Sequence, residues 1–341
     1  MNKFILLLLT TPLLLGSCSK TEIDTDVSSS SSESSSATSD ESTSISSDES
    51  SSSSESSSSE DTPSTPVFSP VVDEENGYVY YGYYPQDRVS DSALISAIND
   101  YGYIINDDNW YEYNGNYYLY EEAQTYNNVT NYTFEDGTSI VNGTSYWFKV
   151  QPIQWRILSK ENNTYLLLAE KLLDNQCFQS DTSSRTIDGK SVRPNNYQYS
   201  ELRAFLNTDF LNTAFSFDNS HIQLNEIVNS ASTTDPTEYH SDDMQNTFDY
   251  VFPLSYQDYH DSNYGFSEYH TSNDACRQAK MTDYDIATGG FLYNQHGIYD
   301  TRSDIGYNLA VTSFNGNGEI SNGNVDFTGT SIRPAMYIQV E

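Results

Sequence analysis

Three histidines in this chain have neighbours of the kind found at metal sites. Each follows a tyrosine and precedes polar or acidic residues; they are His240, His260 and His270. Imidazole nitrogens together with a carboxylate from Asp243 or Asp261 are ligands that zinc accepts. The spacing matches no known ligand motif, however, and solvated loop histidines are the competing interpretation.

Three aspartates in the C-terminal third suggest a second kind of chemistry. Asp300, Asp304 and Asp326 lie near turns rich in glycine and asparagine, where oxygen ligands for calcium can converge. Asp300 and Asp304 are also the candidate carboxylate pair of a hydrolase. The chain contains no Gly-x-Ser-x-Gly, His-Glu-x-x-His or phosphate-loop motif. We therefore assign no catalytic residue and no cofactor; zinc at the histidines and calcium at the aspartates are the two metals weighed, and calcium is the one retained as a candidate.

The cysteines and a few basic residues complete the set of candidates. Cys177 and Cys276 are a candidate disulfide that would close a loop of about a hundred residues, or else two separate buried thiols. Arginines 156, 302 and 333 stand in a chain of few bases, so each is expected to pair with a carboxylate and to fix a loop. Recognition of an anion or ligand is the alternative role. The candidate structural or ligand-binding set is Trp155, Arg156, Arg302, Ser303 and Arg333.

The overall charge limits the class of partner. The 341 residues include 49 Asp and Glu against 15 Lys and Arg, a formal net charge of −34. Nucleic-acid binding depends on basic patches that neutralise phosphates, so this balance argues against it. The 29 tyrosines suit either a tyrosine-rich contact surface or tyrosine-rich strands.

Hydrophobic periodicity predicts the elements that must position these residues. Strands are expected at 77–86, 152–158, 164–170 and 331–340, with a hairpin at 308–321 that turns at Asn315–Gly318. The strand 77–86 is expected to end at Pro85. A helix is predicted over 199–215, with Ser200 as its N-cap and a break at 207–209.

The N-terminus has the layout of an export signal. Phe4–Leu15 is an apolar run too short to span a bilayer, and Gly16, Ser17 and Cys18 follow it. This end resembles the lipobox of bacterial lipoproteins, which implies cleavage before Cys18 and fatty acylation of its sulfur. A plain signal peptide with an incidental cysteine is the alternative. The expected layout is a signal at 1–18, a disordered Ser/Asp/Glu-rich tether at 19–66 and one globular domain at 67–341.

Several motifs taken together resemble an uncharacterised domain family of Gram-positive surface proteins. They are "YGYYPQ", "IQWRIL", "YLLLAEKLLD", "LRAFLNTDFLNTAF" and "SIRPAMYI", and the likeness covers most of 78–341. The chain departs from the family at 299–306, where a tryptophan and a proline are missing. It also departs at 91–146, an acidic, Tyr/Trp-rich insertion that we expect to form a hairpin pair at the domain edge.

The closing strand and the loop-rich last third also resemble the C-type-lectin and formylglycine-generating-enzyme fold group. The resemblance implies an α+β fold with small twisted antiparallel sheets, one or two helices and a loop-rich C-terminal third. The cysteine pair of those enzymes has no match here, so their activity is not carried over.

The expected function is a lipid-anchored, non-catalytic lectin-like module at the outer face of the bacterial membrane. It would contact glycan, peptide or protein through loops in 239–330. An envelope hydrolase and a purely structural surface protein are the alternatives.

Overall fold

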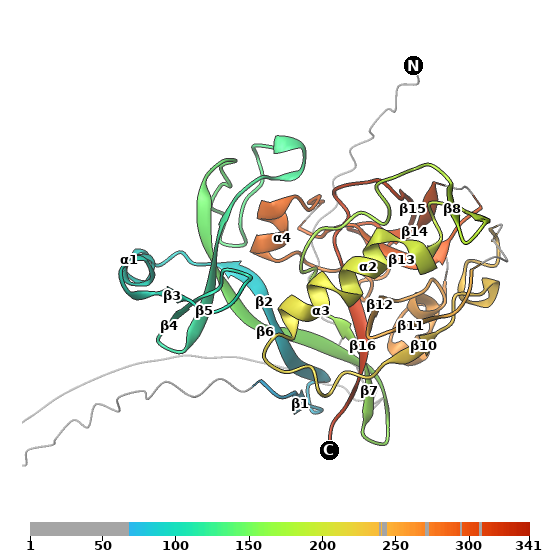
Figure 1. Ribbon diagram of the computed structural model, residues 1–341, viewed down its shortest axis with the longest axis horizontal. Coiled ribbons are helices and arrows are strands. Elements are labelled where there is room, and N and C mark those ends of the chain that lie inside the picture. The colour runs from blue at the N-terminus through green and yellow to red at the C-terminus, as the bar shows by residue number, and fades with distance from the viewer. Residues whose placement is uncertain (1–67, 239, 241–243, 270–272, 294, 307–308) are drawn as a thin grey trace, which may run out of the picture. The chain divides into compact units, whose positions relative to one another are not determined.

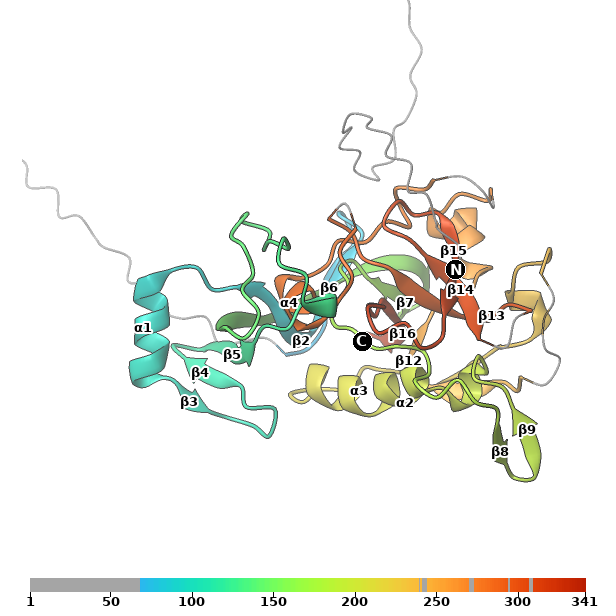
Figure 2. The ribbon, with the colours of Figure 1, turned by 90° about the horizontal axis from the view of Figure 1, so that it is seen from above.

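One long strand organises the main sheet. In the computed structural model, β6 (Ser145–Glu161) pairs along one edge with β2 (Tyr78–Arg88). Its other edge pairs first with β5 (Asn116–Glu122) and then with β7 (Thr164–Ala169). The sheet therefore divides into two branches along β6 (Figures 1 and 2).

The structure describes residues 68–341 except 239, 241–243, 270–272, 294 and 307–308. These residues belong to one compact unit, Ser64–Glu341. Cys18, the proposed tether, His270 and Asp243 lie outside the described residues. No helix of the described part is long and apolar enough to cross a membrane.

The remaining strands extend the two branches or form small separate sheets. One branch continues through β4 (Tyr111–Tyr113) to β3 (Tyr103–Ile104), the other through β16 (Pro334–Gln339) to β12 (Val251–Pro253), and β1 (Val71–Asp73) pairs with β2. The small sheets are β8 (Arg185–Ile187) with β9 (Lys190–Val192), β10 (Asn225–Ile227) with β11 (Thr247–Asp249), and β13 (Tyr299–Asp304), β14 (Ala310–Phe314) and β15 (Ile320–Asn324). All the paired strands are antiparallel, and with the few helices they confirm an α+β fold.

The helices are short and lie against this framework. They are α1 (Ser92–Tyr101), α2 (Glu201–Asn207), α3 (Asp209–Ala214) and α4 (Asp283–Thr288). Single 3₁₀ turns occur at Tyr126–Asn128, Tyr197–Tyr199, Ala231–Thr233, Asp258–His260 and Ser262–Tyr264. Figures 1 and 2 show α2 and α3 end to end along one face of the main sheet.

The predicted helix and its break are both confirmed. The Ser200 hydroxyl accepts a hydrogen bond from the Arg203 amide at 3.1 Å, as an N-cap does. Thr208 has φ −123° and ψ −82°, which separates α2 from α3. Phe210 and Phe215, on and just after α3, pack on the rings of Tyr84 and Trp155 in the sheet.

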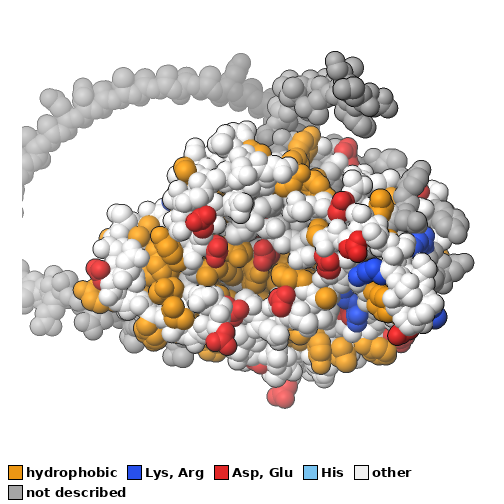
Figure 3. All heavy atoms as spheres, turned by 45° about the horizontal axis from the view of Figure 1, so that its top comes forward, with side chains coloured by type: hydrophobic (Ala, Val, Ile, Leu, Met, Phe, Trp, Pro, Cys, Tyr) orange, Lys and Arg blue, Asp and Glu red, His pale blue; other side chains and the backbone are white. Residues whose placement is uncertain are grey.

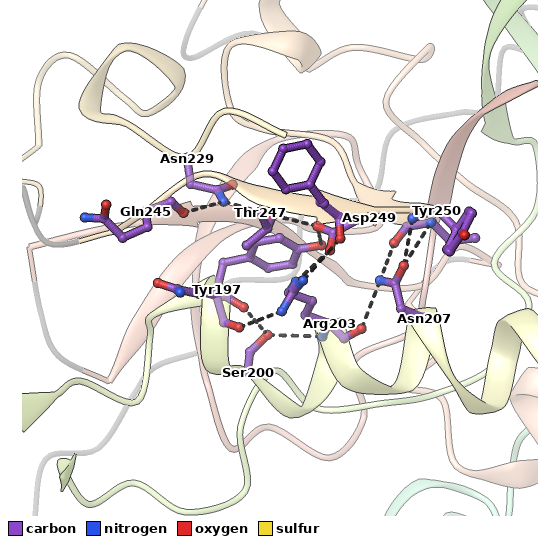
Figure 4. Close-up of polar contacts among 12 residues, drawn as sticks. Tyr197, Ser200, Arg203, Asn207, Asn229, Gln245, Thr247, Asp249 and Tyr250 are labelled. Carbon is purple, nitrogen blue, oxygen red and sulfur yellow. Dashed lines mark hydrogen bonds and ion pairs between the residues drawn. The ribbon is translucent and has the colours of Figure 1, made fainter. Parts of the chain in front are cut away.

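A buried polar network fixes α2 to the small sheet that contains β11 (Figure 4). The carboxylate of Asp249 is fully buried and accepts from Arg203 Nε at 2.7 Å, Tyr197 OH at 3.1 Å and Thr247 Oγ1 at 2.7 Å. Because each carboxylate oxygen has donors, the network holds the helix without leaving a bare charge. We interpret it as structural.

Most strand predictions are confirmed, and two need correction. Strand β2 does not end at Pro85 but continues to Arg88, and Pro85 pairs with Val150 of β6. The insertion at 91–146 does form the expected pair of hairpins, β3–β4 and β4–β5, but β5 also pairs with β6, so the hairpins extend the main sheet instead of packing on its edge. Helix α1 within the insertion was not predicted, although Asp91 caps it and Leu94, Ile95 and Ile98 have helical spacing.

Candidate functional site

A pocket of about 380 Å³ lies where the insertion faces the short helices α3 and α4. Strands β2 to β5 form one wall, and Thr213 of α3 and Tyr284 of α4 form the other. Tyr84, Trp110 and Tyr284 are among its lining residues, whereas the Tyr120 ring packs against Trp147 on the other face of β5. Its size falls within the range of small-molecule sites.

Two carboxylates, Asp108 and Glu121, line this pocket. Asp108 accepts hydrogen bonds from two neutral groups, Thr213 Oγ1 at 2.8 Å and Asn106 Nδ2 at 3.3 Å. Within the part of the chain that the structure describes, neither carboxylate has an ion-pair partner. No Lys, Arg or His is among the described residues that line the pocket.

Local backbone chemistry explains why these side chains face the pocket. Asn109, with φ 59°, closes the turn between β3 and β4, and Asn106 Oδ1 accepts from the Trp110 amide at 3.0 Å. Side chains alternate along β5, so Leu119 and Glu121 share one face. A backbone hydrogen bond of 2.7 Å from Gln124 to Ala287 holds the insertion against α4.

Further acidic side chains lie behind the wall, and of these Asp174 adds to this charge. The hydroxyl of Tyr84 donates to the carboxylate of Asp174, and burial raises the pKa of Asp174 to about 6. Burial, together with the nearby carboxylates of Asp174 and Glu121, raises the pKa of Tyr284 well above its ordinary value. Asp285 is fully buried, and neither of its carboxyl oxygens has a hydrogen-bond partner among the described residues.

Acidic and basic side chains are unevenly distributed over the face of the protein shown in Figure 3. In Figure 3, acidic side chains lie among and around hydrophobic ones over the left and centre of the face shown, while the basic side chains in view gather at the right. Among the exposed aromatic side chains, Tyr101, Tyr103 and Tyr120 belong to α1, β3 and β5.

The residues singled out from the sequence as binding candidates are mostly structural. Trp155 is completely buried and donates from Nε1 to the Tyr81 carbonyl at 2.8 Å. Arg156 forms two hydrogen bonds to the carboxylate of Glu170, at 2.9 and 2.8 Å. These contacts hold β6 to its neighbours.

The arginine and serine of the 299–306 segment are also bound into the fold. Arg302 Nη1 donates to Asp258 Oδ2 at 2.8 Å and to the Pro253 carbonyl at 3.0 Å. Ser303 Oγ donates to the Thr233 carbonyl at 3.0 Å. Both side chains thus fix loops to β13.

Arg333 differs from the expectation that it pairs with a carboxylate. Its guanidinium donates to the carbonyls of Ala169 and Arg277 at 3.1 and 3.0 Å and to Tyr299 OH at 3.1 Å. Carbonyl oxygens and the face of the Tyr299 ring, 5.2 Å away, surround the charge in place of an acid. This residue is 2% exposed, so no ligand reaches it.

The histidines and aspartates do not meet as a metal site within the described residues. No group of three or more His, Cys, Asp or Glu side chains there is placed to hold a metal ion. His260 Nδ1 donates to the Tyr256 carbonyl at 2.7 Å, and the imidazole stacks on that tyrosine ring. His240 Nδ1 lies 3.6 Å from Asp304 Oδ1.

Asp300 and Asp304 lie on one buried strand in different surroundings. Arg193 Nη2 is 3.6 Å from Asp304 Oδ2, whereas both oxygens of Asp300 lack a hydrogen-bond partner in the described structure. Burial raises the pKa of Asp300 to about 8. Neither side chain lines the pocket.

The candidate disulfide is not present. Cys177 is a free cysteine, and burial raises the pKa of its thiol to about 11. Cys276 packs partly buried against the main hydrophobic cluster. The sequence offered no means of testing the pairing, because cysteine count says nothing of distance.

Sequence reasoning missed the pocket because it looked for ligand contacts in 239–330. The usable signal was the stretch 107–122, "DDNWYEYNGNYYLYEE", where rings and carboxylates interleave. What could not be read from it is that α3 and α4, about a hundred residues or more away, close the other side.

The comparisons with known proteins give a family but no activity. A family model described as a domain of unknown function (DUF6273) matches residues 162–340, which include α3, α4 and the closing strand β16. The insertion and the motifs before residue 162 lie outside the match. Searches of the curated proteins and of the solved structures gave no match. The chain belongs to this family, the domain of unknown function DUF6273.

Proposed function

We propose that this protein is a bacterial surface lipoprotein whose folded part is a non-catalytic recognition module. The apolar run and Cys18 support export and acylation, with the serine-rich segment 19–66 as a spacer. Intact-mass analysis of protein purified from its own cells should find acyl chains on an N-terminal Cys18. An unmodified N-terminus at that position would remove the anchor from the proposal.

One observation carries the recognition role, which is the pocket between the insertion and the helices α3 and α4. It is a cavity of about 380 Å³ with aromatic walls and two carboxylates that lack ion-pair partners among the described residues. Concave sites with a few converging polar groups are the usual ligand sites of proteins. A purely structural protein has no need for such a site.

The hydrolase alternative gains no support from the aspartates named for it. Asp300 and Asp304 are 5% and 1% exposed, and they do not face the pocket. The lectin-like fold remains part of the proposal. It is supported by the antiparallel sheets and by the long irregular segments between β11 and β14.

The test blocks the pocket from the helix side. Thr213 lines the cavity, whereas the adjacent Asn212 is exposed and does not. Thr213→Trp should fill the cavity and abolish capture of glycans or peptides from a cell-envelope extract by the immobilised protein. Asn212→Trp adds the same bulk in solvent and should leave capture unchanged.

Circular dichroism melts of both variants check that they are folded. Equal capture by wild type and Thr213→Trp would refute the pocket as the recognition site. Turnover of an envelope component by the wild type would refute a non-catalytic role.

A further inference from the structure

The residues that line the pocket indicate the chemical class of its ligand. This inference rests on the proposed recognition function. The cavity walls combine tyrosine and tryptophan rings with Asp108 and Glu121, and the described residues that form them include no basic side chain. A ligand that enters therefore meets two carboxylates set among aromatic side chains. Both attract a cation.

The existing contacts leave this negative charge without a counterion in the described structure. Asp108 receives the neutral donors Thr213 and Asn106. Glu121 is half-buried, and its carboxylate has no hydrogen bond or ion pair with any described residue. A half-buried carboxylate in such a position gains from a cationic partner, because water screens it less than at the open surface.

The carboxylate of Asp174, behind the wall, increases the negative potential. The hydroxyl of Tyr84, a residue that lines the cavity, donates to the partly buried carboxylate of Asp174. Burial is the main cause of the raised pKa values of Asp174 and Tyr284, and the charge of Glu121 adds to both. These groups are therefore within electrostatic reach of one another, and no cation among the described wall residues opposes them.

The geometry favours an organic cation over a metal ion. Among the described residues, no three carboxylate, imidazole or thiolate side chains converge closely enough to hold a metal. The volume of about 380 Å³ also exceeds what a bare ion fills. An alkylammonium group, by contrast, uses both the ring faces and the two separated carboxylates.

We propose that this pocket binds an alkylammonium ion, with Glu121 and Asp108 as its counterions and the surrounding tyrosine and tryptophan rings as its walls. A free amine and the lysine side chain of a peptide are the two sources of this chemistry. The acidic surface of the chain suits either, because it raises the local concentration of cations.

The experiment is isothermal titration calorimetry on the purified full-length protein. The probes are spermidine, Nα-acetyl-lysine amide and its Nε-acetylated form, which has the same stem without the charge. The two charged probes should bind and the Nε-acetylated probe should not. The tighter of the two charged probes identifies the source of the ligand.

For each of the two carboxylates, the acidic residue next to it in the sequence lies outside the pocket. Its substitution is a control with the same net charge. Glu121→Gln should weaken binding by about tenfold or more, because it removes a counterion in the cavity. Glu122→Gln, one residue along β5 and exposed, should change it less than about twofold. Asp108→Asn and Asp107→Asn form a second pair, since Asp107 is exposed and does not line the pocket.

The outcomes separate this inference from the proposed function. Absence of binding by both charged probes, or equal loss in Glu121→Gln and Glu122→Gln, overturns the alkylammonium ligand. If an envelope ligand is lost in Thr213→Trp but not in Glu121→Gln, the recognition role stands and the cationic ligand is wrong. If Thr213→Trp loses nothing, both are wrong.

Discussion

At the scale of single residues, the buried carboxyl groups fall into two classes. Some have donors or a basic partner that compensates their charge, and others have none among the described residues. Asp249 has three donors and Asp304 lies beside Arg193, so their charges are compensated. Asp300 and Asp285 have no such donors in the described structure. Their pKa values are raised by burial, which means that the native state holds them in the neutral form.

The pKa of Asp300 gives a pH dependence with a definite sign. Its pKa rises from 3.8 to about 8 on folding, so the native state binds the proton more tightly than the unfolded state. The stability linked to this group is complete below pH 3.8 and is lost as the pH rises towards 8. Asp300→Asn should therefore raise the free energy of unfolding at pH 8 by about 1–3 kcal/mol, and by less at pH 5.

Urea unfolding at the two pH values measures this difference. The matched control is Asp304→Asn, which should destabilise the protein by about 1–3 kcal/mol because it removes the charge beside Arg193. A loss of stability in Asp300→Asn that is the same at both pH values would show that Asp300 is charged in the folded protein.

At the scale of elements, a bulge in β2 fits this strand to α3. The register between β2 and β6 shifts between Tyr80 and Tyr83, and Gly82 lies there with φ 69°. A Cβ atom added at Gly82 would come within 2.5 Å of the Phe215 ring. The glycine thus permits both the backbone turn and the close approach of the ring.

Gly82→Ala should accordingly lower the free energy of unfolding by about 2 kcal/mol or more, through strain and overpacking together. Gly77 separates the two effects, since its φ is 77° and nothing lies within 4 Å of the added Cβ. Gly77→Ala should cost only about 1 kcal/mol, the backbone part. Thermal or urea melts of both variants provide the comparison, and equal losses would rule out the contact with Phe215.

Local patterns predicted the elements better than they predicted how the elements pair. The alternation in 152–158, the apolar run in 164–170 and the Ser200 cap each act within a few residues, and the structure confirms them. The pairing of β5 with β6 depends on side chains from distant parts of the chain. Tyrosine-rich strands look alike in sequence, so the sequence could not tell a peripheral hairpin from an extension of the main sheet.

The candidate site was less predictable than the fold for the same reason. The arginines at motif positions stood out in the sequence, but Arg156 and Arg302 are engaged with Glu170 and Asp258. The pocket forms only when segments near 84, 108, 121, 213 and 284 come together. No single one of these segments carries a motif.

At the scale of the whole molecule, the pocket joins a family domain to a part outside the family match. The matched region, 162–340, supplies Thr213 and Tyr284, whereas Tyr84, Asp108 and Glu121 come from the chain before it. Family membership alone therefore does not describe the ligand. The specificity proposed here belongs to this chain's own insertion.

Hydrogen–deuterium exchange of the full-length protein, with and without a cell-envelope extract, tests this account most directly. The measurement does not require that the ligand be identified, and it compares all backbone segments at once. The account predicts slower exchange on addition of the extract in 104–121, 209–214 and 283–288, the segments around the pocket. Slower exchange confined to segments 245–269 and 289–330, or none anywhere, would contradict it.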